Sequence, residues 1–155
     1  MNKVDFYLSL IRQSIQFKDM SMLRHFADRW YCSTYGYLNA KGNPNWSLIV
    51  GNEYISEGYK KYPNKPVVLK EHIVPLKVIG NLLLTHPACA NDNLAIDGLL
   101  RKYLKFATIL KEEDKLLLKS EMPPGFYDPI HIDYDQIFLR YDKAKIKLFY
   151  SKGNS

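Results

Sequence analysis

The spacing of apolar residues predicts helices through the first sixty residues. One helix is expected between residues 2 and 18, and a second begins near Asp19 or Ser21, of which Ser21 is a suitable N-cap. A connection containing glycine and proline follows at residues 32–46. A third helical stretch then opens at Pro44 or Asn45 and ends by Tyr62, which precedes a proline. The apolar positions that define these helices are Val4, Leu8, Ile11, Ile15, Leu23, Phe26, Ala27, Trp30, Trp46, Ile49, Val50 and Tyr54.

The pattern changes at residue 64, where short β-rich runs begin to alternate with helical ones. Strands are expected at residues 66–69, 106–110 and 145–150. Helices are expected at residues 75–84, 93–104, 112–119 and 134–141. Asp92 or Asn91 is the expected N-cap of the second of these helices, and residues 122–129 are too rich in proline for regular structure.

These elements predict an α+β fold in one domain covering residues 1–155. A chain of 155 residues suits a single core, because two cores of half this size would each be marginal. Residues 1–63 form the expected helical section, packed on a small two- to three-stranded sheet. Residues 64–155 form the expected mixed section that contains this sheet.

The charge of the chain favours a polyanionic partner. Lysine and arginine number 22 against 16 acidic residues, a net charge of +6, and there are 12 tyrosines. Basic side chains neutralise phosphates and tyrosine rings stack on unpaired bases, although any lysine-rich surface shows the same pattern. The candidate nucleic-acid-binding residues are Arg24, Arg29, Lys60, Lys61, Arg101, Lys102 and Lys105.

Several kinds of protein are disfavoured by simple features of the chain. Cys32 and Cys89 belong to no CxxC pair, and they are too few for a disulfide framework. No signal-peptide pattern and no apolar run of ~18 residues is present. The expected setting is the cytoplasm, without a membrane.

The stretch KEHIVP, residues 70–75, is the strongest candidate for chemistry. A neutral histidine such as His72 can deprotonate water, and a carboxylate such as Glu71 can hold Mg²⁺. At the frayed end of a strand both side chains can reach one pocket. The alternative is structural: Glu71 pairs with Lys70, Lys77 or another base, and His72 is satisfied by hydrogen bonds.

The string EHIVP resembles the start of the HNH family of nucleases. The resemblance extends loosely to KEEDKLL (111–117), MPPGF (122–126) and FLRYDKAKI (138–146). It implies a ββα-metal unit in which His72 is the general base and Glu71 binds Mg²⁺ or another divalent cation. His86 and Asn93 are then the remaining candidate metal ligands. No histidine follows Asn93 on the next predicted helix, which departs from the family pattern.

The sequence therefore leaves two functions open. The first is a metal-dependent HNH-like endonuclease, related to phages or toxins, acting on DNA rather than RNA. The second is a non-enzymatic phage or mobile-element inhibitor, for example an anti-CRISPR protein. Such an inhibitor binds a host defence nucleoprotein through a basic, tyrosine-rich surface. Convergence of Glu71, His72 and one of His86, Asn91, Asp92 or Asn93 around one ion favours the enzyme, whereas a Glu71 tied to a lysine and a buried His72 count against it.

Overall fold

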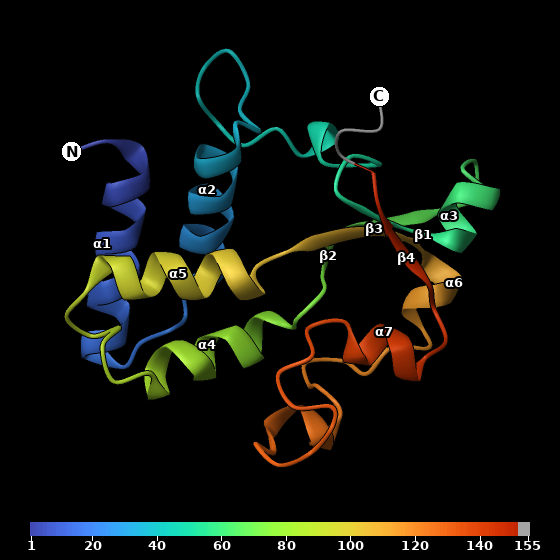
Figure 1. Cartoon of the computed structure of the whole chain (residues 1–155). Helices are drawn as coiled ribbons and strands as arrows, with labels where there is room; N and C mark the ends of the chain where they lie inside the picture. The colour runs from blue at the N-terminus through green and yellow to red at the C-terminus, as the bar shows by residue number, and fades with distance from the viewer. Residues whose placement is uncertain (152–155) are drawn as a thin grey trace. The chain divides into compact units, whose positions relative to one another are not determined.

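The computed structural model describes residues 1–151 and divides the chain into two compact units that interleave along the sequence. The helical unit consists of residues 1–45 and 76–104. The sheet unit consists of residues 46–75 and 105–155. The chain therefore passes from one unit to the other three times (Figure 1).

Four helices build the helical unit: α1 (Lys3–Phe17), α2 (Leu23–Tyr35), α4 (Leu76–Thr85) and α5 (Asn93–Tyr103). Polar caps mark where two of them begin. The Asn2 side chain accepts a hydrogen bond from the Asp5 amide, and Asp92 accepts one from the Leu94 amide. Each bond satisfies an amide that has no partner within its own helix, so both residues fix a helix start.

The sheet unit is built around four short strands. They are β1 (Tyr54–Ser56), β2 (Val67–His72), β3 (Phe106–Leu110) and β4 (Leu148–Tyr150). The strands lie in the order β2-β3-β1-β4 (Figure 1). β1 is parallel to β3, and the other two pairings are antiparallel. β2 therefore forms one edge of the sheet and β4 the other.

Short helices connect the strands of the sheet unit. They are α3 (Glu57–Lys61), α6 (Lys111–Asp114) and α7 (Leu139–Lys143), with 3-10 turns at Trp46–Leu48 and Pro124–Tyr127. The start of α3 is anchored to α6, because the Ser56 hydroxyl donates to the Glu113 carboxylate at 2.5 Å.

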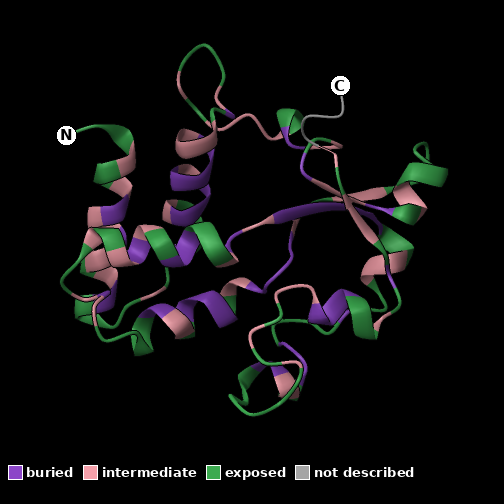
Figure 2. Cartoon of the chain, in the orientation of Figure 1, coloured by how far each residue is buried: buried purple, intermediate pink, exposed green. Residues whose placement is uncertain are grey.

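The core of the sheet unit lies against β3, whose five residues are all buried (Figure 2). One hydrophobic cluster joins this strand to the end of β2 and to α7. Its buried members are Ile73, Ala107, Ile109, Leu117, Tyr141 and Ile146. The other side of β3 is covered by aromatic residues, since Phe106 lies 5.4 Å from Trp46 between ring centroids. A strand covered on both sides reads as a continuous apolar run, which is the pattern of residues 106–110.

The predicted α+β class is confirmed, and the sheet has four strands where two or three were expected. The interpretation of residues 44–62 as one helical stretch was wrong. A 3-10 turn ends at Leu48, Gly51 has a φ of +74°, and the chain forms β1 before only residues 57–61 become the helix α3. The helix at 112–119 ends at Asp114. The helix at 134–141 begins only at Leu139, since Asp135 has a φ of +58°.

Two further expectations concern the ends of elements and the membrane. Ser21 is not the N-cap of α2: that position is Met22, which makes no side-chain capping bond. Among the described residues, no helix combines the length and the apolar character needed to cross a bilayer. The expectation of a single domain stays a prediction; the helical unit includes residues 76–104 in addition to the N-terminal section.

Candidate functional site

The side chains of Glu71 and His72 lie on opposite faces of the sheet. In the ladder between β2 and β3, Glu71 is paired with Ala107 and His72 with Phe106. The His72 ring is 7% exposed and lies 4.7 Å from the Phe106 ring between centroids. Glu71 instead points to the face that carries the Tyr141 cluster. The alternation of side chains along a strand therefore continues to the end of β2, and the two residues do not share a pocket.

Arg140 of α7 holds the end of β2 in place. One of its terminal nitrogens lies 2.5 Å from the Glu71 carboxylate and also donates to the carbonyl oxygens of His72 and Ile73. The other terminal nitrogen donates to the Leu118 carbonyl at 2.7 Å. The Arg140 side chain is only 4% exposed, so its charge is shielded from water and is balanced by the Glu71 carboxylate. We call Glu71, Arg140 and the three carbonyls the arginine clamp.

The environment of Tyr141 shows that this face of the sheet is shielded from solvent. Burial raises the pKa of the Tyr141 hydroxyl, and the negative charge of Glu71 raises it further, while Arg140 acts in the opposite direction. The hydroxyl lies 3.5 Å from the Glu71 carboxylate. A neutral phenol and a guanidinium therefore surround the one carboxylate of the KEHIVP stretch.

The arginine clamp does not fit a divalent cation. A metal site needs several oxygen or nitrogen donors around a vacant position, whereas the donor here is in direct contact with a positive charge. Within residues 1–151, no group of three or more His, Cys, Asp or Glu side chains is arranged to hold a metal ion. The Mg²⁺ expectation and the ligand roles of Glu71, His86 and Asn93 stay predictions that rest on the resemblance.

The stretches that carry the resemblance meet in the core of the sheet unit. Arg140 and Tyr141, from FLRYDKAKI, contact Glu71 of EHIVP. Leu117, from KEEDKLL, belongs to the same buried cluster as Ile73 and Tyr141. Packing and the buried ion pair therefore account for these residue types without any catalytic role.

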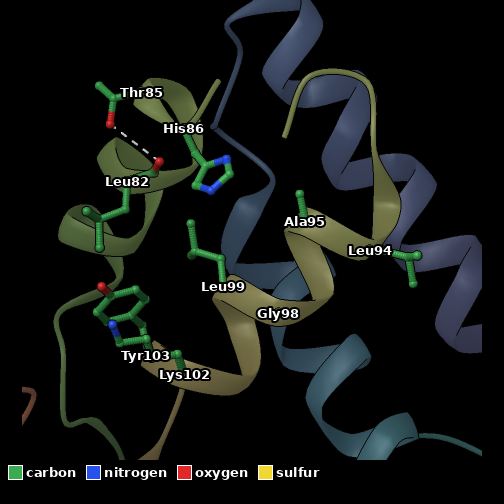
Figure 3. Close-up of a pocket in the computed structure, with 9 residues that line it drawn as sticks. All are labelled: Leu82, Thr85, His86, Leu94, Ala95, Gly98, Leu99, Lys102 and Tyr103. Atoms are coloured by element: carbon green, nitrogen blue, oxygen red, sulfur yellow. Dashed lines mark hydrogen bonds between the residues drawn. The ribbon is translucent and has the colours of Figure 1, made fainter. Parts of the chain in front are cut away.

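His86 and Asn93 belong to the helical unit, where each has a structural partner. His86 follows α4, and its Nδ1 accepts a hydrogen bond from the Ala88 amide at 3.2 Å. The Asn93 amide group donates to the Ser9 hydroxyl at 3.3 Å. The His86 ring also extends toward a hollow of about 450 Å³ between α4 and α5, lined in addition by Leu99, Lys102 and Tyr103 (Figure 3). The hollow is lined by both apolar and polar residues, and His86 is the one usual metal ligand among them.

The predicted basic residues are distributed over both units. Arg24, Arg29, Arg101 and Lys102 lie on α2 and α5 of the helical unit. Arg101 pairs with Asp97 at 2.6 Å, so part of its charge is compensated locally. Lys105 lies in the sheet unit and is half-buried, and this burial lowers its pKa. Lys60 and Lys61 lie at the end of α3 and are exposed.

Lysines and aromatic rings gather around α3 and β4. The ammonium groups of Lys60 and Lys147 lie 4.9 and 5.0 Å from the centroid of the Phe149 ring. Next to them, Lys61 and Lys65 lie 5.3 and 4.5 Å from the Tyr62 ring. We call Lys60, Lys61, Lys147, Tyr62 and Phe149 the lysine–aromatic face. Within residues 1–151, none of its three lysines forms an ion pair, whereas Lys65 pairs with Glu112.

Sequence reasoning missed two residues of importance. Arg140 is 69 positions from Glu71, so the ion pair was sought at the neighbouring Lys70 and Lys77. Lys70 instead lies over the Trp46 ring, at 4.0 Å. Phe149 was predicted only as part of a terminal strand. In the fold, the ammonium groups of two lysines lie near its ring. The sequence signal for both was the basic, aromatic composition of residues 138–150.

Comparison of the chain with protein-family models, with curated proteins and with solved structures finds no match.

Proposed function

We propose that the protein is a non-enzymatic binding protein whose lysine–aromatic face binds the nucleic acid of a partner, either a free strand or a nucleoprotein. The observation that carries this proposal is the Phe149 ring with two ammonium groups near it, those of Lys60 and Lys147, at 4.9 and 5.0 Å from its centroid. An aromatic ring with cations beside it suits an unpaired base and the phosphates next to that base. An inhibitor of a host defence nucleoprotein is one form that this function takes.

The state of Glu71 and His72 supports a binding role over catalysis. Glu71 is held by Arg140, and the buried His72 ring lies on the other side of the sheet. A general base must be open to the water that it activates and a metal ligand must have an oxygen free of other charges, so the burial of His72 and the Arg140–Glu71 ion pair count against both roles. The HNH-like endonuclease is the competing hypothesis, and an assay of metal-dependent cleavage separates it from the binding role.

The proposal is tested by fluorescence anisotropy with a labelled single-stranded DNA of 20 nucleotides, beside the matching duplex and RNA. Phe149→Leu keeps an apolar side chain but removes the ring, so we expect it to weaken binding by about 5- to 150-fold, as loss of one stacked base does. Phe149→Tyr retains a ring and should bind like the unmodified protein. Comparison of these two variants distinguishes the loss of ring stacking from a loss of packing around β4.

The lysines are tested through the dependence of binding on salt. Removing one phosphate contact to a single strand should reduce the slope of log K against log salt by about 0.7. We therefore expect Lys60→Gln and Lys147→Gln each to flatten the slope, while Lys41→Gln, in an exposed loop of the helical unit, leaves it unchanged. Absence of binding to all three probes, or equal binding by all variants, would contradict the proposal.

A further inference from the structure

A loop between the second 3-10 turn and α7 exposes two large apolar side chains. Ile130 is 94% exposed and Ile132 is 90% exposed, and Tyr127 and Tyr134 on either side are about half exposed. Isolated exposed apolar residues are ordinary, but two isoleucines at alternate positions of one loop form a local apolar projection. The loop is among the exposed segments of the sheet unit in Figure 2.

This loop is ordered by its own hydrogen bonds. The Ile130 amide donates to the Asp128 side chain at 3.1 Å, and the Asp133 amide donates to Nδ1 of His131 at 3.0 Å. Asp133 also pairs with Lys143 of α7 at 3.1 Å, which fastens the loop to the helix. The two isoleucines are therefore held outward in a fixed arrangement, and little conformational entropy is lost when a partner covers them.

The loop is acidic in a basic protein. Residues 127–134 contain Asp128 and Asp133 but no lysine or arginine. The partner that fits this loop has an apolar hollow with a cationic rim, because like charges across an interface are unfavourable.

The helical unit contains a groove with that chemistry. It lies between the start of α2 and α4, has a volume of about 350 Å³, and includes Met20, Leu23, Leu76 and Leu84 in its lining. Arg24 and Lys77 stand at the same groove, and neither forms an ion pair within residues 1–151. Leu84 is 39% exposed, so part of the apolar lining is open to a partner.

We propose that the loop of one copy, residues 127–134, docks into the α2–α4 groove of a second copy of this chain. Ile130 and Ile132 enter the apolar hollow, and Asp128 lies near Arg24 and Lys77, because Asp133 is already paired with Lys143. The contact joins two different surfaces, so it is heterologous: in a pair of copies, one keeps a free groove and the other keeps a free loop for further copies. This inference is independent of the proposed nucleic-acid binding.

The test is analytical ultracentrifugation of the full chain and two variants. Ile130→Ser/Ile132→Ser destroys the loop contact, and Arg24→Glu/Lys77→Glu destroys the groove contact. We expect the unmodified chain to associate as its concentration rises toward about 1 mM, and each variant to associate roughly a hundredfold more weakly or not at all. Leu116→Ser, at a residue 65% exposed outside both surfaces, should behave like the unmodified chain.

The decisive sample is an equal mixture of the two variants. The loop variant retains an intact groove and the groove variant retains an intact loop, so the mixture should form a heterodimer and nothing larger. An unmodified chain that stays monomeric overturns the proposal. Association that survives in either variant alone, or a mixture that stays monomeric, also overturns it. Circular dichroism of each variant confirms that the fold is retained.

Discussion

The arginine clamp and the lysine–aromatic face use positive charge in opposite ways. At the clamp, Arg140 is 4% exposed and donates to one carboxylate and three carbonyl oxygens. At the face, Lys60 and Lys147 are exposed and lie beside a ring. A buried charge whose partners are all internal contributes to the fold, whereas an exposed charge remains available to a partner molecule. The Glu71 carboxylate of the KEHIVP stretch therefore contributes to the fold through Arg140.

The largest effect on stability is expected when the clamp is opened. Arg140→Met leaves the Glu71 carboxylate without its counter-ion, and breaking such a buried pair typically costs about 3–5 kcal/mol. Urea unfolding measures the loss. An Arg140→Met protein that is as stable as the unmodified chain would remove the contrast between the two regions.

A double-mutant cycle sharpens the interpretation of that loss. Glu71→Leu/Arg140→Met removes both charges, so the unpaired carboxylate is no longer left behind. We expect a coupling energy of about 1–3 kcal/mol between the two positions, with the double variant more stable than Arg140→Met alone. If the free-energy changes of the two single substitutions simply add, the loss in Arg140→Met does not come from the Arg140–Glu71 pair.

Tyr141 provides a pH-dependent probe of the same region. Burial and Glu71 raise its pKa above the ordinary value of 10.0, so the folded state favours the neutral phenol. The stability that the folded protein gains from this preference is complete below pH 10. It decreases as the pH rises further, because only the unfolded chain then loses the proton. Relative to Tyr141→Phe, the unmodified protein should lose up to about 1.4 kcal/mol of stability per pH unit above 10. Urea unfolding between pH 8 and 11.5 tests this, and parallel curves for the two proteins would contradict it.

The smallest effect on stability is expected at the lysine–aromatic face. Lys60→Gln/Lys147→Gln changes two exposed positions without an ion pair, so the free energy of unfolding should change by no more than about 0.5 kcal/mol. The same protein should show weakened binding in the anisotropy assay. A large destabilisation would mean that these lysines serve the fold as Arg140 does.

The elements that could be predicted are those whose signal is local. The apolar spacing of α1, α4 and α5 and the Asp92 cap lie within a few residues of one another, and the structure confirms them. β1 was missed because its three residues become a strand through pairing with β3 and β4, which are more than fifty residues away. The helical spacing of Trp46, Ile49 and Val50 resembled an amphipathic helix over too short a stretch to be decisive.

The candidate site shows the same limit. The sequence placed Glu71 and His72 at a strand end, which the structure bears out, since β2 ends at His72. It could not show that the pleat separates the two side chains or that a base from α7 reaches Glu71. Both facts depend on strand register and on long-range packing, which a motif of five residues does not encode.

One measurement tests the central claim, that the KEHIVP stretch is structural and the lysine–aromatic face is functional. Labelled single-stranded DNA and supercoiled plasmid are incubated with the protein in Mg²⁺, Mn²⁺ or EDTA, beside His72→Ala and Lys60→Gln/Lys147→Gln. Anisotropy and denaturing gels of the same samples report binding and cleavage. We expect binding that the lysine variant weakens and no metal-dependent cleavage by any protein. Metal-dependent cleavage that His72→Ala abolishes would contradict this account and establish the nuclease.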